Sequence, residues 1–208
     1  MQNVIPTERS VAERTLRDRA QAYADEVRRL IDATYAVMRR TDSLDPRVHD
    51  IVREAGLSNQ AFYRHFRGKD ELLLAVLDDG QARLLATLER RMARAEPGAG
   101  QVRAWIEGIC EQARNVEAAA NTRPFLVNGA RLAERYPDAT TTQRERVVAP
   151  LRGAVATVGG DPVRDADAIY HVTMGRVQDA IARRVIPGRD EVDHTVAFAL
   201  RAIGVSTP

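Results

Sequence analysis

The stretch of sequence that decides the fold is residues 56–69, Gly56-Leu57-Ser58-Asn59-Gln60-Ala61-Phe62-Tyr63-Arg64-His65-Phe66-Arg67-Gly68-Lys69. Gly56 precedes a short predicted helix, Gly68 ends it, and Ser58 is a favourable N-cap residue. Phe62 and Phe66 are four residues apart, so both fall on one face of that helix. The stretch predicts the second helix of a helix-turn-helix, which packs one face inward and presents the other to DNA.

The polar side chains of this stretch are of the kinds that contact DNA. A rotation of about 100° per residue leaves four of them facing away from the phenylalanines, namely Asn59, Gln60, Tyr63 and Arg64. Asn59 and Gln60 match the edge of an adenine, and Arg64 matches a guanine or a phosphate. Tyr63 and His65 suit phosphate oxygens. The alternative is a solvated helix face, which is what most charged faces are.

Lys69 is the only lysine in the chain, one of 31 lysine and arginine residues. It follows the predicted reading helix and opens the next helix, where a flexible ammonium is well placed to bind a DNA phosphate. Chance in an arginine-rich composition is the alternative explanation of a single lysine. Residues 57–69 contain three fixed cations and no carboxylate, so the segment predicts a locally cationic surface.

The residues before Gly56 supply the other helices that such a unit needs. No glycine or proline interrupts residues 11–45, and apolar residues at helical spacing make 24–40 the clearest helix there. Ser10 and Glu13 form a capping-box pattern, which predicts a helix start nearby. Asp45-Pro46 suits the start of a short bracing helix that ends at Gly56.

The chain after the quoted stretch also has helical patterns. Leucine and valine recur at helical spacing from Lys69 to about Ala95, and residues 96–100, rich in glycine and proline, form the clearest linker. Further helical segments follow, and the prolines that punctuate them are Pro124, Pro137 and Pro150.

Two segments near the end of the chain, residues 163–185 and 189–203, are typical of an antiparallel helical hairpin. Their apolar stripes can pack on the rest of the chain or face a second copy across a two-fold axis. No pair of strands with hairpin chemistry is present. The sequence therefore predicts an all-α protein: an N-terminal three-helix DNA-binding unit with a helix-turn-helix, followed by a larger helical ligand-binding and dimerisation domain.

Composition narrows the function classes. The chain has 208 residues, 44% of them hydrophobic, and no apolar run reaches the roughly 20 residues that span a bilayer. The first residues lack the pattern of a secretion signal, so we expect a cytoplasmic protein without a membrane partner. Cys110 is the sole cysteine, which excludes an internal disulfide and a thiol-based zinc site. The net charge of +2 is too small to indicate nucleic acid by itself.

Three groups of consecutive residues form a more specific pattern: Ile51-Val52-Arg53-Glu54-Ala55-Gly56-Leu57-Ser58, Phe62-Tyr63-Arg64-His65-Phe66 and Gly68-Lys69-Asp70-Glu71-Leu72-Leu73. Together they resemble the DNA-binding unit of the TetR family of transcriptional regulators, over about residues 24–76. The resemblance implies a homodimer whose N-terminal units each read half of a palindromic operator. The C-terminal helices would bind a small organic inducer and dimerise, and most relatives repress transcription.

The resemblance also implies domains and DNA contacts. The domains are a polar, partly helical extension over 1–23, a helix-turn-helix domain over 24–70 and an effector-binding and dimerisation domain over 71–208. The positions that fall on the DNA contacts of the family are Arg47, Ser58, Asn59, Gln60, Tyr63, Arg64, His65 and Lys69. The basic extension can enter a minor groove or remain a solvated helix.

The effector site is predicted mainly from the resemblance, because ordinary core packing explains each bulky residue at least as well. The candidate residues are Trp105, Ile109, Phe125, Asn128, Tyr170 and Met174. Asp167 with His171, and Asp190 with His194, have the i, i+4 spacing of a metal-binding pair, but two ligands do not make a site. No metal or other cofactor is predicted.

Two further function classes remain open at this point. An enzyme is disfavoured because the chain has no nucleophile elbow, phosphate loop, paired-carboxylate motif or thiol cluster, so no catalytic residue is predicted. A helical protein-interaction adaptor that keeps the helix-turn-helix without using it is the other alternative. The sequence does not name the effector, the operator or the controlled genes.

Overall fold

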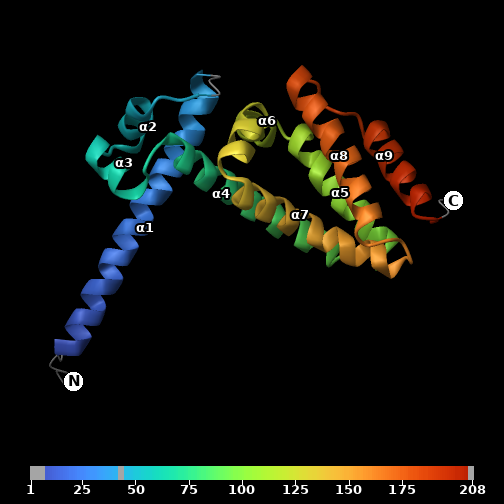
Figure 1. Ribbon diagram of the computed structural model, residues 1–208, viewed down its shortest axis with the longest axis horizontal. Coiled ribbons are helices and arrows are strands. Elements are labelled where there is room, and N and C mark those ends of the chain that lie inside the picture. Colours follow the sequence, from blue (N-terminus) through green and yellow to red (C-terminus); the bar gives the residue numbers. More distant parts are fainter. Residues whose placement is uncertain (1–7, 42–44, 206–208) are drawn as a thin grey trace. The chain divides into compact units, whose positions relative to one another are not determined.

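The structure is a computed structural model that describes residues 8–41 and 45–205, and all regular elements within those residues are helices (Figure 1). In chain order they are α1 (Glu8–Thr41), α2 (Val48–Ala55), α3 (Asn59–His65), α4 (Lys69–Met92), α5 (Ala99–Arg114), α6 (Val116–Arg135), α7 (Pro137–Thr157), α8 (Arg164–Arg183) and α9 (Arg189–Ala202). None of these described helices is both long and apolar enough to cross a membrane. The prediction of an all-α fold is confirmed.

The chain divides into two compact units, residues 1–73 and 74–208, and α4 runs through the division. The first unit holds α1 to α3 and the opening turn of α4. The second holds the rest of α4 and the five helices that follow it. The resemblance placed the division at residue 70, within the same turn of α4.

In the first unit, α1 is a single helix of 34 residues. Its C-terminal half carries the buried residues, among them Leu30, Val37 and Met38, whereas residues 12–25 are exposed. The helix already includes Glu8, so Ser10 lies inside it and the predicted capping box does not mark its start. The polar residues before position 24 continue the helix because nothing in them interrupts the backbone pattern.

In the second unit, α5 lies at the centre and contacts α6, α7, α8 and α9. Trp105 and Ile106 are fully buried there, and the Trp105 indole Nε1 donates to the Val147 carbonyl of α7 at 3.0 Å. A Cβ on Gly108 would come within 2.5 Å of the buried Leu88 side chain, so glycine at this position lets α5 approach α4. These contacts form one apolar core around α5.

Two prolines lie inside helices rather than at their ends. Pro124 is within α6 and Pro150 is within α7, whereas Pro137 occupies the start of α7 as its fixed φ favours. An internal proline removes one backbone hydrogen bond. In α7 the neighbouring Val148 and Leu151 are fully buried, so tertiary packing holds the helix through the defect.

The lone cysteine is part of the core. Cys110 is buried in α5, and this burial raises the pKa of its thiol to about 11. We therefore expect the native protein to react with iodoacetamide at neutral pH far more slowly than the urea-unfolded chain, because the thiolate is the nucleophile. Mass spectrometry of timed reactions measures the difference. Equal rates in the native and unfolded proteins would contradict it.

Candidate nucleic-acid interface

The turn between α2 and α3 is held by backbone geometry and by one arginine of α1. Gly56 has φ of 61°, the left-handed conformation that favours glycine, and Leu57 N–H donates to the Val52 carbonyl at 2.9 Å. Arg29 donates to the carbonyls of Ala55 and Gly56 at 2.5 and 3.1 Å. The C-terminus of α2 therefore receives a cation that complements the helix dipole.

The short helix α3 depends on a cap and two aromatic anchors. The Ser58 hydroxyl accepts a hydrogen bond from the Ala61 N–H at 3.1 Å, as the sequence pattern indicates. Phe62 is fully buried and Phe66 nearly so, with their ring centroids 5.8 Å apart. Because a helix of seven residues is not stable alone, these anchors determine how α3 sits on the unit.

Four side chains of α3 are exposed. This set, the outer arc of α3, consists of Asn59, Gln60, Tyr63 and Arg64. Tyr63 leaves 62% of its surface accessible although it is aromatic and borders Phe62. Arg64 is also more than half exposed. The hydrogen-bonding groups that match base edges and phosphates are therefore available to solvent, whereas Phe62 and Phe66 are buried.

His65 lies on the other side of α3, and the predicted phosphate contact is corrected on this point. Its side chain is 0% exposed, and its Nε2 is 2.6 Å from the Glu26 Oε2 of α1. The Tyr23 ring meets it edge-on, with centroids 4.2 Å apart. Rotation of about 100° per residue turns position 65 toward the same side as Ala61 and Phe62, so His65 joins α3 to α1 instead of facing DNA.

Glu26 is the residue of this site that sequence reasoning missed. Its Oε2 is also 2.5 Å from the Arg64 guanidinium, so one carboxylate oxygen contacts two consecutive residues of α3. The pKa of the Glu26 carboxyl lies below its usual value because of the hydrogen bonds from His65 and Arg64. Glu26 precedes Val27 and Leu30 of the helical stripe, but no local pattern pairs it with residues 38 and 39 positions later.

Lys69 lies at the start of α4, where its ammonium binds the Asp45 carboxylate. About a quarter of the Lys69 side chain is exposed. Asp45 comes two residues before Arg47, the exposed N-cap residue of α2, so the start of α2 lies close to the start of α4. Arg67, between α3 and α4, is exposed as well. Arg47 and Arg67 are thus exposed as predicted cations, and the Lys69 ammonium is paired with a carboxylate.

Four of the predicted effector residues belong to one region of the second unit, because Tyr170 and Met174 pack against the core that contains Trp105 and Ile109. Trp105 and Ile109 are fully buried in the core of the second unit, so their surfaces are already occupied by packing, and we withdraw them as effector contacts. Phe125, Tyr170 and Met174 are partly buried. Burial raises the pKa of Tyr170, whose ring lies 5.1 Å from the Arg144 guanidinium. The Asn128 side chain lies outside the described residues.

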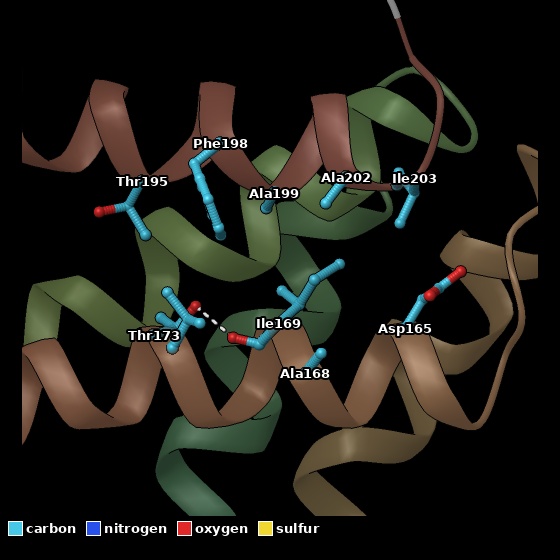
Figure 2. A pocket seen from close by; sticks show the side chains of 10 residues that line it. Asp165, Ala168, Ile169, Thr173, Thr195, Phe198, Ala199, Ala202 and Ile203 are labelled. Atoms are coloured by element: carbon cyan, nitrogen blue, oxygen red, sulfur yellow. Dashed lines mark hydrogen bonds between the residues drawn. The ribbon is translucent and has the colours of Figure 1, made fainter.

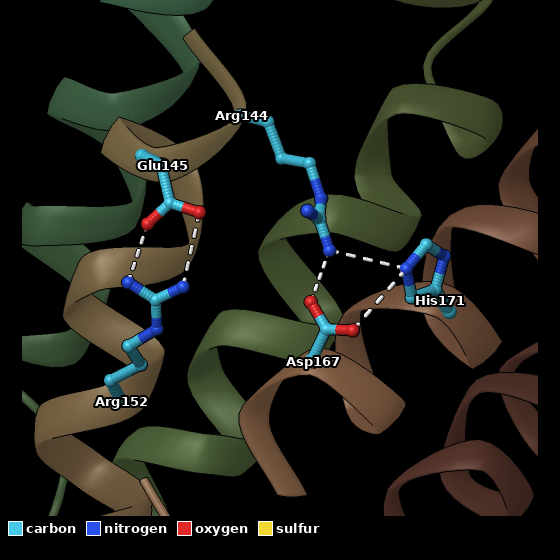
Figure 3. Close-up of polar contacts among 5 residues, drawn as sticks. All are labelled: Arg144, Glu145, Arg152, Asp167 and His171. Atoms are coloured by element: carbon cyan, nitrogen blue, oxygen red, sulfur yellow. Dashed lines mark hydrogen bonds and ion pairs between the residues drawn. The ribbon is translucent and has the colours of Figure 1, made fainter. Parts of the chain in front are cut away.

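Asp167 and His171 engage an arginine (Figure 3). Arg144 of α7 donates to the Asp167 carboxylate, and the same nitrogen lies 3.2 Å from His171 Nε2. His171 Nε2 and Asp167 Oδ2 are themselves 3.5 Å apart. A guanidinium therefore occupies the atoms that would bind a metal. Arg152 and Glu145 form a separate pair within α7.

The comparison with protein families identifies the first unit. Residues 30–76 match the family described as bacterial regulatory proteins, tetR family, from the buried part of α1 to the second turn of α4. Residues 30–76 are therefore a TetR-family DNA-binding domain. The match contains the whole of α2, the turn at Gly56, the outer arc of α3 and Lys69, so the sequence resemblance is confirmed.

Solved TetR-family structures have the same fold over most of this chain. A TetR transcription regulator from Haloarcula marismortui has a TM-score of 0.68 at 17% identity, covering 87% of this chain and 97% of its own. A putative TetR-family regulator from Mesorhizobium loti has a TM-score of 0.67 at 18% identity, covering 87% of this chain and 96% of its own. SmeT, the repressor of a Stenotrophomonas maltophilia multidrug efflux pump, has a TM-score of 0.65 at 17% identity, covering 86% of this chain and 91% of its own. The TetR-like layout therefore continues through the second unit.

Proposed function

We propose that this TetR-family regulator is a cytoplasmic repressor. In the proposal it binds a palindromic operator in double-stranded DNA as a homodimer and is released by a small organic effector. The observation that carries the proposal is the contrast on α3, where two buried phenylalanines fix one face and the outer arc stays exposed. A helix-turn-helix needs this arrangement to enter the major groove.

The proposed contacts divide into base contacts and phosphate contacts. Asn59 and Gln60, at the N-terminal end of α3, are assigned to base edges, because recognition helices enter the groove with these residues first. Tyr63 and Arg64 lie one turn later. The residues assigned to the flanking phosphates are Arg47, Ser58, Tyr63 and Lys69. His65 is left out because its ring is enclosed between α3 and α1.

The proposed dimer contact is the apolar surface between α8 and α9 (Figure 2). A shallow hollow there is lined by Ile169, Val172 and Thr173 of α8 and by Phe198 and Ala199 of α9. Val172 and Phe198 are large apolar residues that are nevertheless 40% and 49% exposed. A two-fold axis would bring this surface onto its own copy and remove both side chains from water.

The effector is proposed to contact the partly buried residues Phe125, Tyr170 and Met174 of the second unit. Tyr170 and Met174 are four residues apart on α8, so they share one side of that helix. Both pack against the core around Trp105. A small organic molecule that bound beside them would displace side chains of that core, which is how binding in this unit could alter the operator complex.

Selection of DNA by the purified full-length protein tests the proposal. We expect enrichment of one palindromic motif from genomic fragments, and an affinity for it that falls steeply with salt because phosphate contacts release counterions. Fluorescence titrations of the enriched and a scrambled duplex give the selectivity. Failure to select any motif would overturn the proposal and favour an adaptor that has kept the fold.

Lys69→Ala and Gln60→Ala should separate phosphate contacts from base contacts. Removing the Lys69 ammonium is expected to weaken binding to all duplexes alike and to reduce the salt slope by about 0.9, the value for one phosphate contact. Removing the Gln60 amide should instead lower selectivity for the enriched motif and leave the slope unchanged. Salt-dependent titrations on matched and scrambled duplexes measure both quantities. An unchanged slope for Lys69→Ala would show that the assigned contact is wrong.

A further inference from the structure

A single carboxylate from α1 contacts two neighbouring residues of α3, one facing inward and one facing outward. Glu26 Oε2 lies 2.6 Å from His65 Nε2 and 2.5 Å from the Arg64 guanidinium. Both hydrogen bonds are charge-assisted when Glu26 is ionised. Charge-assisted hydrogen bonds are about twice as strong as hydrogen bonds between neutral groups. Because Glu26 lies on a long helix with a buried C-terminal half, the oxygen is a fixed point for α3.

The inward contact fixes the rotation of α3 about its own axis. The His65 side chain is fully buried, and the Tyr23 ring closes it from α1. Because an ionised carboxylate can only accept, His65 Nε2–H is the donor to Glu26, and His65 Nδ1 is buried without a hydrogen-bond partner. Any rotation of α3 that broke this contact would leave a second buried polar atom of the ring unpaired.

The outward contact fixes the direction of a side chain on the outer arc. Arg64 is 55% exposed, yet its guanidinium is held by Glu26 instead of sampling solvent freely. An unrestrained arginine loses much conformational freedom when it binds, and a side chain held in place beforehand loses less. The pair also neutralises one cation, so Arg64 is less available as a general phosphate contact.

We propose that Glu26 is a positioning residue that determines the sequence selectivity of α3 by directing Arg64 toward a base edge and away from the DNA backbone. This proposal rests on the DNA-reading function proposed above. Glu26 touches no DNA in it and acts through Arg64. The partner of Arg64 is a guanine, because a guanidinium fork matches the two acceptors that guanine presents in the major groove.

The experiment compares five full-length proteins: the wild type, Glu26→Gln, Arg64→Gln, the double variant, and Asp25→Asn as a matched control. Asp25 is the neighbouring carboxylate on α1, exposed and hydrogen-bonded to Gln21 at 2.8 Å, so its replacement changes the net charge equally without touching α3. Thermal unfolding by circular dichroism establishes that each variant is folded. DNA selection defines the motif, and titrations over a range of salt give the selectivity ratio and the salt slope.

In Glu26→Gln we expect the selectivity ratio to fall about tenfold, the effect of losing one good base contact. The salt slope should steepen by about 0.9, because the released Arg64 binds a phosphate. Arg64→Gln should lower the ratio similarly without the steeper slope. Adding Glu26→Gln to it should change nothing further, and Asp25→Asn should leave the ratio unchanged.

Three results would overturn the proposal. One is an unchanged motif, ratio and slope in Glu26→Gln while the wild type binds selectively, which leaves the DNA-reading function standing. Another is an equal loss of selectivity from Glu26→Gln with or without Arg64, which would mean that Glu26 acts only by holding His65. The third is a wild type that selects no motif, which removes the proposed function as well.

Discussion

Replacing Phe62 with alanine is expected to destabilise the DNA-binding unit by about 3–5 kcal/mol, the usual cost of truncating a buried aromatic side chain. Phe62 is fully buried, and its ring centroid lies 5.8 Å from that of Phe66. The only other large apolar anchor of this short helix is its C-cap residue, Phe66, among the described residues of the segment. A domain of this size is stable by only about 5–15 kcal/mol, so the variant should lose operator binding at moderate temperature.

Urea unfolding measures this effect unit by unit. Trp105, the only tryptophan, lies in the second unit, so its fluorescence reports that unit, while circular dichroism follows the helices of both. We expect Phe62→Ala to move part of the circular dichroism transition to lower urea and to leave the Trp105 transition in place. Identical transitions in the variant and the wild type would contradict the anchoring role.

Tyr63→Ala is the matched control, because position 63 is adjacent in sequence but on the exposed side of α3. Its stability should change by about 1 kcal/mol or less, the value of an exposed aromatic contact. Its operator affinity should fall by about 5–10-fold, the equivalent of one net hydrogen bond. The two neighbouring substitutions therefore separate the residue that stabilises α3, Phe62, from the residue proposed to contact DNA, Tyr63.

Phe198→Glu is expected to give the second large effect, on assembly. A carboxylate in the apolar hollow between α8 and α9 would face its own copy in the proposed dimer, where desolvation and like-charge repulsion both oppose contact. The chain should sediment as a monomer at micromolar concentration. Its affinity for a full palindrome should fall by about 10²–10⁴, because the gain from binding two half-sites together is lost.

Val163→Glu is the control for this prediction. Val163 precedes α8, is 60% exposed and does not line the hollow, so the same change of charge there should preserve the dimer. Sedimentation velocity and titrations of full and half operators provide the comparison. A Phe198→Glu protein that remains dimeric, or a Val163→Glu protein that dissociates, would place the interface elsewhere.

The helix-turn-helix could be predicted from sequence because its determinants are local. The Gly56 turn, the Ser58 cap and the i, i+4 phenylalanines all act within one or two turns of backbone. The helix ends at His65, with Phe66 as its C-cap. His65 was assigned by residue type, although its angular position already indicated the buried side.

Sequence alone did not separate the core from a ligand site in the second unit. Trp105 was a candidate for effector contact because bulky side chains line both kinds of region. Its indole instead donates to a carbonyl 42 residues later, a contact that exists only when α5 meets α7. The prolines of α6 and α7 follow the same logic, since long-range packing outweighed the local tendency of proline to end a helix.

Periodicity, caps and turn residues by themselves determined α2, α3 and the side chains of α3 that could face DNA. Only the tertiary structure decided that Glu26 binds Arg64 and His65, that Lys69 binds Asp45, and that Trp105 belongs to the core. The physical reason is the range of the interactions. Helix formation depends on neighbours within four residues, whereas these partners are 24 to 42 residues apart and meet only after the helices pack.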